Sequence, residues 1–216
     1  MSPPQLRLFL VRHGETAANR ELRYVGTRDE PLAETGAVQA ERVAAALCGL
    51  PLAAVYASPL RRTAETGQRI ATALGLPLAA SDLLREQSFG AWEGMTRAEV
   101  AALGDAQGLE LRRWESDPAV APPGGESLVA VQERVLALVR ELAEREERGR
   151  WVALVSHVGP IKALVCAALG VPLGAARRMF LDPGTVSVVD WDDAPVVRLF
   201  NAHGHLGWQD ARWMKR

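Results

Sequence analysis

The sequence predicts an α/β fold of three layers, in which helices cover both faces of a mostly parallel central sheet. Short apolar runs alternate with amphipathic helical segments along most of the 216 residues. Hydrophobic residues make up 48% of the chain, which is enough to close a core without disulfides or structural metals. No internal repeat or low-complexity linker divides the sequence, so residues 1–216 are expected to form one domain.

Strands are predicted where short apolar runs end at turn-forming residues. The first run stops abruptly at His13 and Gly14, and this length and ending favour a strand over a helix. The last two runs are predicted to form a hairpin around Asp192 and Asp193. The six predicted strands are residues 6–11, 53–57, 78–84, 151–155, 186–191 and 196–200.

Helices are predicted where apolar residues recur at three- and four-residue steps. Ser58 and Pro59 are expected to open one of them, as a side-chain cap and a first-turn proline. The predicted helices are residues 34–47, 58–74, 96–103, 128–142 and 160–169. The irregular stretch 86–123 is rich in Gly, Trp and Pro, and a short cap insertion is expected at about 90–125.

Charge and composition exclude several classes of protein. The chain has 25 basic and 26 acidic residues, so it has no global field for nucleic acid or an anionic membrane. No apolar run approaches the ~20 residues of a membrane helix, and the first residues lack signal-peptide features, so a cytoplasmic location is expected. Cys48 and Cys166 lie in apolar helical stretches without zinc-ligand spacing, and buried thiols are expected.

Candidate functional residues lie just beyond predicted strand ends. Arg12 and His13 follow the first strand, Ser58 follows the second, and Ser156 and His157 close the strongest one. Ligands of parallel α/β sheets bind beyond the carboxyl ends of the strands. These positions therefore predict one site at that edge of the sheet.

His13 is a candidate nucleophile. An imidazole near its usual pKa of ~6.5 is partly neutral at pH 7, and nearby arginines favour the neutral form. A neutral imidazole can attack phosphorus and form a covalent intermediate. The alternative is a packed or capping histidine at the end of a strand.

Arg61 and Arg62 lie in the first turn of a predicted helix, where the helix dipole favours an anion and a guanidinium binds phosphate as a fork. His157 is followed by Val158 and Gly159, so its ring and the backbone amides of the next helix can also hold phosphate. The alternatives are a solvated helix face for the arginines and a helix-capping role for the histidine.

Glu86 precedes the aromatic and glycine-rich segment that includes Phe89 and Trp92. A carboxyl group near aromatic rings can serve as an acid near neutral pH, and a leaving alkoxide needs one such proton donor. The alternative is a glutamate in a surface turn. No carboxylate cluster for magnesium, P-loop or G-x-S-x-G elbow occurs in the sequence.

Together these segments resemble the histidine phosphatase superfamily, branch 1, also called phosphoglycerate mutase-like. The resemblance runs in order through Arg12-His13-Gly14, Ser58 to Thr66, Glu86 to Gly94, and Ser156-His157. It implies that His13 is the phosphorylated nucleophile and that Glu86 is the proton donor and later the base. The residues implied to hold the phosphoryl oxygens or the substrate are Arg12, Arg62, His157, Asn19, Gly26 and Val158. No metal or cofactor is implied.

The resemblance lies nearest the α-ribazole phosphatase and broad-specificity phosphatase subgroup, on the segment Tyr24 to Thr27 and the stretch from Trp114 to Ser127. Thr63 and Val158 depart from the family's usual alanine and glycine. The expected activity is metal-independent hydrolysis of a small phosphomonoester. A phosphoglycerate mutase is the alternative, disfavoured by the short cap, and a catalytically silent scaffold is the second.

Two features near the carboxyl end each allow two interpretations. His203 and His205 form an H-x-H pair that suits either a metal or, as preferred, a structural tail of the subgroup. Trp208 and Trp213 are expected to pack either at an interface, such as that of a homodimer, or in the core.

Overall fold

A mixed sheet of six strands forms the centre of the computed structural model, which describes residues 3–208 and 211. The strand order is β3-β2-β4-β1-β5-β6. The pairs β1–β4, β4–β2 and β2–β3 are parallel, whereas β5 runs antiparallel to both β1 and β6. The mostly parallel sheet is therefore confirmed. The strands are β1 (Leu6–Arg12), β2 (Leu52–Ala57), β3 (Leu78–Ala80), β4 (Arg150–Ser156), β5 (Val186–Trp191) and β6 (Val196–Ala202).

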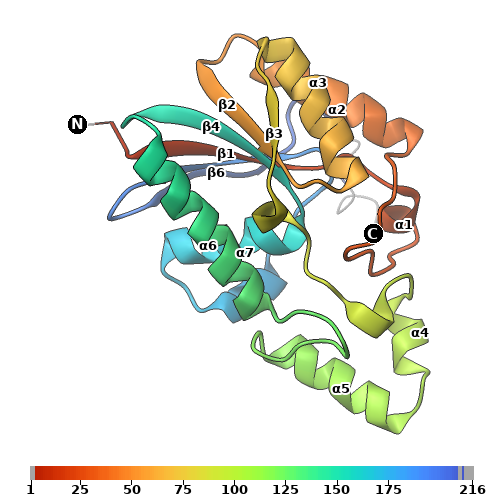
Figure 1. Ribbon diagram of the computed structural model, residues 1–216. Coiled ribbons are helices and arrows are strands. Elements are labelled where there is room, and N and C mark those ends of the chain that lie inside the picture. Colours follow the sequence, from red (N-terminus) through yellow and green to blue (C-terminus); the bar gives the residue numbers. More distant parts are fainter. Residues whose placement is uncertain (1–2, 209–210, 212–216) are drawn as a thin grey trace.

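Helices cover both faces of this sheet, which confirms the three-layer prediction (Figure 1). One face packs against α2 (Glu34–Leu47) and α3 (Arg61–Leu74), and the other against α6 (Leu128–Arg145) and α7 (Val158–Leu169). A strand buried on both faces reads as a continuous apolar run, because successive side chains point to opposite layers.

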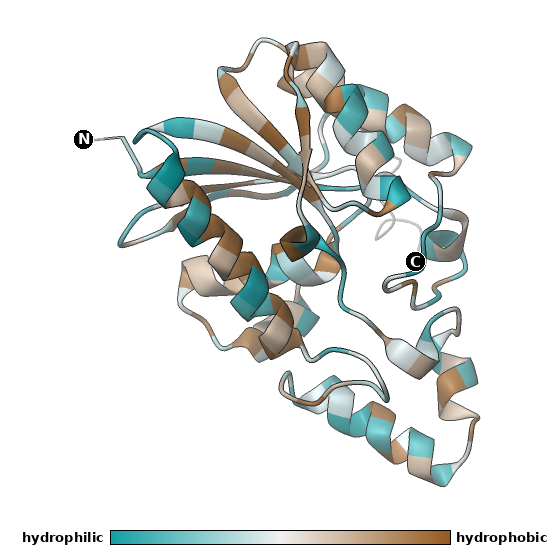
Figure 2. Ribbon diagram, in the orientation of Figure 1, coloured by the Kyte–Doolittle hydropathy of each residue, from teal (hydrophilic) through white to brown (hydrophobic). Residues whose placement is uncertain are grey.

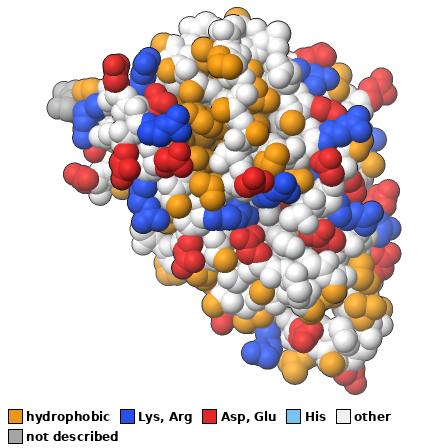
Figure 3. Space-filling view, viewed as in Figure 1, with side chains coloured by type: hydrophobic (Ala, Val, Ile, Leu, Met, Phe, Trp, Pro, Cys, Tyr) orange, Lys and Arg blue, Asp and Glu red, His pale blue; other side chains and the backbone are white. Residues whose placement is uncertain are grey.

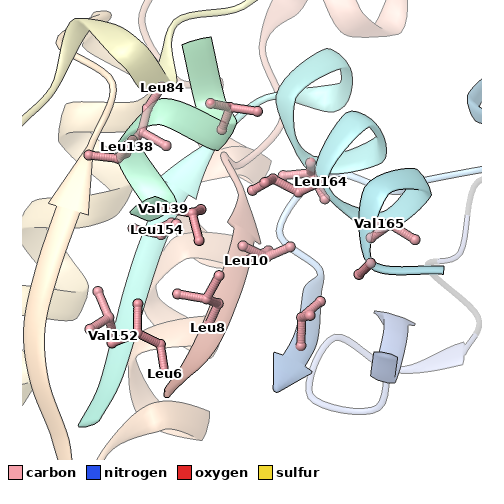
Figure 4. Close-up of a cluster of buried hydrophobic side chains, with 14 of the residues drawn as sticks. Leu6, Leu8, Leu10, Leu84, Leu138, Val139, Val152, Leu154, Leu164 and Val165 are labelled. Carbon is pink, nitrogen blue, oxygen red and sulfur yellow. The ribbon is translucent and has the colours of Figure 1, made fainter. Parts of the chain in front are cut away.

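Strand β1 shows this alternation directly. Leu6, Leu8 and Leu10 belong to the cluster that includes α6 and α7 (Figure 4), whereas Phe9 and Val11 pack with α2 and α3. Burial on both sides fixes the register of β1, since a shift by one residue would exchange the two sets. The position of the residues that follow β1 is fixed with it.

The segment predicted as an insertion contains two helices, α4 (Arg97–Ala101) and α5 (Asp105–Ser116), which lie beyond the sheet (Figure 1). They enclose a small aromatic cluster that includes Trp92 and Trp114, joined by Tyr24 from the amino-terminal part of the chain. The prediction of one helix at 96–103 was too simple. Gly104 begins α5 and Gly108 lies inside it, and glycine weakens a helical signal.

Three local predictions were wrong. The third strand ends at Ala80, and a 3₁₀ turn (Asp82–Leu84) follows, because Leu84 turns into the core. Ser58 does not cap α3; Leu60 occupies the cap position and makes no side-chain cap bond. Cys48 is exposed at the end of α2, and only Cys166 is buried.

The remaining short elements connect these layers. They are α1 (Ala17–Arg20), the 3₁₀ turn Gly90–Trp92 and the 3₁₀ helix Leu173–Arg178. Along α6, apolar and polar residues divide between the side facing the sheet and the outer side (Figure 2). Charged side chains of both signs are interspersed on the face shown in Figure 3.

Within the described residues, no helix is both long and apolar enough to cross a bilayer. Trp208 is 62% exposed and stacks on His203 with ring centroids 6.4 Å apart. A core role for Trp208 is therefore wrong, whereas Trp213 lies outside the described residues.

We expect Leu154→Ala to lower the free energy of unfolding by about 3 kcal/mol, because it leaves a cavity in the central strand β4. Leu154 is fully buried in the cluster of Figure 4. Leu199→Ala is the matched control, since Leu199 is 45% exposed on β6, and its cost should stay below about 1 kcal/mol. Urea denaturation measures both, and equal losses would contradict this packing.

Candidate active site

Parallel pairing of β1 with β4 brings two histidines together at the carboxyl edge of the sheet. Arg12 lies opposite Ser156, and the backbone N–H of His13 donates to the Ser156 carbonyl oxygen at 3.1 Å. The rings of His13 and His157 therefore follow neighbouring strands, with centroids 5.1 Å apart. On the other side of β4, the Ser58 N–H donates to the Val155 carbonyl oxygen at 3.1 Å.

The His13 ring is held in one tautomer. Its Nδ1 lies 2.6 Å from the carbonyl oxygen of Gly14, and because a carbonyl oxygen only accepts, Nδ1 carries the proton. Burial, followed by the positive charges of Arg62 and Arg12, lowers the pKa of His13 well below its ordinary value. The ring is therefore neutral at pH 7, with the lone pair on Nε2.

His157 is buried beside it and binds Ser58. Its Nε2 lies 3.0 Å from Ser58 Oγ, while Nδ1 is buried and makes no hydrogen bond within the described residues. Burial, and then the positive charge of Arg62, also lowers the pKa of His157. His157 occupies the cap position of α7, yet its side chain does not cap the helix.

Arg62 is almost fully buried in the first turn of α3, with 1% of its surface exposed. Its Nη1 donates to the Arg28 carbonyl oxygen at 2.7 Å and its Nη2 to that of Gly26 at 2.8 Å, and its buried Nε makes no bond within the described residues. Burial lowers the pKa of Arg62, but a guanidinium stays charged at neutral pH.

Arg12 lies at the same edge, 7% exposed, and its Nη1 donates to the Leu181 carbonyl oxygen at 2.6 Å. The guanidinium groups of Arg12 and Arg62 both act electrostatically on His13. Backbone carbonyl oxygens hold Arg62 at two of its nitrogen atoms and Arg12 at one. Two cations held in this way can bind the oxygens of a doubly charged anion.

Glu86 lies at the amino end of α7. Its carboxylate accepts the N–H groups of Val158 at 3.1 Å, Gly159 at 3.0 Å and Gln87 at 2.9 Å. Three backbone donors, two of them at a helix start, hold the group in place. Val158, predicted to serve through its backbone, thus donates its N–H to Glu86.

Gly26 lies in a loop that Glu93 fastens to the segment after Glu86. The carboxylate of Glu93 accepts the backbone N–H of Thr27 at 2.9 Å and that of Phe89 at 3.1 Å. The φ of Gly26 is +56°, and a Cβ there would lie 2.1 Å from Glu93 Oε1, so only glycine fits. The loop in turn presents the carbonyl oxygens that hold Arg62.

Asn19, predicted to help bind substrate, closes the cap of α1: its Oδ1 accepts the Thr16 N–H at 3.1 Å. His205 Nε2 lies 2.8 Å from the Gly184 carbonyl oxygen, and His203 is buried. No cluster of three potential metal ligands occurs in the part of the chain described by the structure.

Sequence reasoning missed Lys162 and the loop carbonyls that hold Arg62. Lys162 lies on α7 one turn after Val158, and it lines a cavity together with Glu86. Its spacing of four residues from Val158 was the available signal. The carbonyl groups had no signal, because any residue type supplies one.

Comparison with known proteins places this geometry in a family. Residues 8–202 match the model of the histidine phosphatase superfamily (branch 1). The chain is 36% identical to phosphoserine phosphatase 1 of Hydrogenobacter thermophilus over 204 residues, covering 94% of this chain and 95% of that protein. The chain belongs to the histidine phosphatase superfamily, branch 1.

Two further relatives are mycobacterial. A bifunctional protein of Mycobacterium tuberculosis is 40% identical over 207 residues, which are 93% of this chain but only 55% of that protein. The chain thus spans about half the length of that relative. A solved mycobacterial glucosyl-3-phosphoglycerate phosphatase complexed with VO3 superposes with a TM-score of 0.81 at 32% identity, covering 91% of this chain and 99% of the other.

The two lowered histidine pKa values predict a loss of stability in acid. The unfolded chain protonates both histidines near their ordinary pKa of ~6.5, whereas the folded protein keeps them neutral to lower pH. The contribution of the two histidines to the free energy of unfolding is therefore fully present above that pH and is lost as the pH falls. Near pH 5.5 the loss is about 1 kcal/mol per pH unit for each histidine.

His157→Gln removes one of these contributions, so the fall in unfolding free energy between pH 7 and pH 5.5 should be shallower in this variant. Urea denaturation at several pH values measures it. A variant whose slope equals that of the wild type would show that His157 is not held neutral.

Proposed function

We propose that the protein is a metal-independent phosphatase that hydrolyses a small phosphomonoester through a phosphohistidine at His13. The observation that carries this proposal is the bond from His13 Nδ1 to the Gly14 carbonyl oxygen, which leaves a lone pair on Nε2 of a neutral ring. A positioned neutral imidazole of this kind is a nucleophile for phosphorus. Two relatives named as phosphatases support the same reaction class.

The groups around His13 match the charge of the transferred phosphoryl group. Arg12 and Arg62 supply two positive charges, and the unbonded Nδ1 of His157 supplies a neutral donor when Ser58 donates to its Nε2. Phosphoryl transfer needs mainly positioning and electrostatic stabilisation, so these groups suffice without a metal. In this proposal Arg12, Arg62 and His157 hold the phosphoryl oxygens.

Asn19 and Gly26 act differently in the proposal. The sequence resemblance placed both at the substrate, and their contacts support positioning roles through α1 and through Arg62. Val158 likewise serves by holding Glu86 in place. None of the three needs a side-chain contact with the phosphoryl group to contribute.

In the proposed reaction, Glu86 acts first as an acid and then as a base. His13 Nε2 attacks phosphorus, the bond from phosphorus to the ester oxygen breaks, and protonated Glu86 gives its proton to that oxygen. Water then attacks the phosphorus of the phosphohistidine, the bond from phosphorus to His13 Nε2 breaks, and the water gives a proton to the Glu86 carboxylate. Inorganic phosphate leaves, and His13 returns to its neutral form.

A phosphoglycerate mutase is the second candidate function, because it would use the same nucleophile. A mutase must protect its phosphorylated intermediate from water. We propose that the segment at about 90–125 forms a cap that is too short to exclude water from the site. The cavity beside Glu86 supports this view, because it extends between α5 and α7 as an open space of about 410 Å³. The cytoplasmic location and the homodimer stay predictions.

Replacement of the nucleophile tests the proposal. We expect His13→Ala to lower the hydrolysis of p-nitrophenyl phosphate about a thousandfold or more, because no other group at the site can take its place. EDTA should not change the wild-type rate. Arg61→Ala is the control, since Arg61 is exposed and pairs with Glu65, and it should retain the wild-type rate.

Equal rates for His13→Ala and the wild type, or loss of activity with chelator, would contradict the proposed mechanism. Conversion of 3-phosphoglycerate to 2-phosphoglycerate, stimulated by 2,3-bisphosphoglycerate, would favour the mutase. Absence of both activities in the wild type would favour a silent scaffold.

The role of Glu86 has a separate test. We expect Glu86→Gln to slow alkyl phosphates about a hundredfold and p-nitrophenyl phosphate tenfold or less, because the nitrophenolate leaves without a proton. Glutamine keeps the shape and one of the acceptor oxygens, so α7 should begin as before. Steady-state rates on both substrates decide it, and equal losses would remove Glu86 from the acid role.

A further inference from the structure

The cavity beside Glu86 is the place where the leaving group must lie if the proposed function is correct. It has a volume of about 410 Å³, and its lining includes Glu86, Phe89, Trp114 of α5 and Lys162 of α7. A group that protonates the ester oxygen touches the first atom of the alcohol. The rest of the alcohol then extends along this cavity, away from His13.

The acidic side chains of the cavity are already satisfied. Glu86 accepts three backbone N–H groups, and Glu115 forms an ion pair with Arg97 at 2.5 Å. Both carboxyl groups therefore already have partners within the protein. Neither of them needs a cation from the substrate.

The basic side chains of the same cavity are not satisfied. The ammonium group of Lys162 forms no hydrogen bond or ion pair among the described residues, although the side chain is half-buried. Arg177 lies over the Trp114 ring, 4.4 Å from its centroid, and donates to the Trp114 carbonyl oxygen, but its buried Nε is unbonded within the described residues. A half-buried cation that forms no ion pair favours a ligand of opposite charge.

The spacing along α7 places Lys162 one helical turn from the amide groups that hold Glu86. Lys162 follows Val158 by four residues and Gly159 by three, so it lies on the helix face that holds Glu86, one turn further along. One turn is about 5.4 Å. An anionic group two or three bonds from the ester oxygen spans this distance.

We propose that Lys162, with Arg177, forms a subsite that binds a carboxylate on the leaving group, so that the preferred substrates are phosphomonoesters of small hydroxy acids. This inference rests on the phosphatase function proposed above. A carboxylate offers a single charge and two acceptor oxygens, which the Lys162 ammonium and the N–H groups of the Arg177 guanidinium can satisfy. Phe89 and Trp114 cover the carbon chain between the two charged ends.

The test compares 3-phosphoglycerate with glycerol 3-phosphate, which share a carbon skeleton and differ in a carboxylate against a hydroxymethyl group. The wild type should favour 3-phosphoglycerate at least tenfold in kcat/KM for phosphate release. Lys162→Met, similar in length but uncharged, should lower this preference at least tenfold, mainly through KM. Lys162→Arg should restore part of it, and Arg178→Met, which removes an exposed neighbouring charge, should leave it unchanged.

The pH dependence adds a second readout. Burial, and then the charge of Arg12, lowers the pKa of Lys162 to about 8; the other charged or titratable groups acting on it are Glu86, Cys166 and Arg177. The wild-type preference for 3-phosphoglycerate should therefore decline as the pH rises from 7 to 9, and the Lys162→Met preference should not follow that decline.

A wild type with no preference, or a Lys162→Met variant whose preference equals that of the wild type, would overturn the subsite. Binding separates this outcome from failure of the phosphatase proposal. In the His13→Ala background, which prevents turnover, calorimetry should show at least tenfold tighter binding of 3-phosphoglycerate than of glycerol 3-phosphate. Equal dissociation constants there would overturn the subsite even if the wild type hydrolyses neither compound.

Discussion

Parallel pairing of β1 with β4 is the constraint on which the rest of the site depends. The register that sets Arg12 opposite Ser156 puts the next residue of each strand, His13 and His157, side by side with ring centroids 5.1 Å apart. Both rings are buried near two guanidinium groups, so neither can be charged at moderate cost. Neutral imidazoles are therefore a requirement of the packing, and the same requirement leaves a lone pair on Nε2 of His13, the proposed nucleophile.

Arg62 is held by backbone dipoles, and these leave its positive charge available for a ligand. Carbonyl oxygens of Gly26 and Arg28 accept from Arg62, and that of Leu181 accepts from Arg12. A carbonyl group orients a guanidinium without cancelling its charge, unlike a carboxylate. The position of Arg62 thus depends on the loop containing Gly26, and Glu93 fixes that loop to the segment following Glu86.

Some parts of the fold and of the site can be predicted from the sequence, and others cannot. Residues buried on both faces give β1 and β4 long apolar runs, so the strand ends, and hence His13 and His157, could be predicted. The helix α5 was missed, because Gly104 and Gly108 weaken its pattern. The side-chain cap expected at Ser58 was wrong, since its hydroxyl binds His157, which follows the neighbouring strand β4, and no local pattern encodes such a partner.

The difference between local and distant partners also explains which half of the site could not be predicted from the sequence. The residues proposed to hold the phosphoryl group follow strands or lie at the start of helices. Their residue types suit phosphoryl transfer. The proposed leaving-group end lies between α5, α7 and the 3₁₀ helix that carries Arg177, and the role of its charged residues can be argued only once their partners are known. From the sequence alone, Glu115 and Lys162 are both interpreted as charged surface residues. Glu115 forms an ion pair with Arg97, whereas Lys162 forms none within the described residues, and this difference is what makes Lys162 the proposed contact for a substrate.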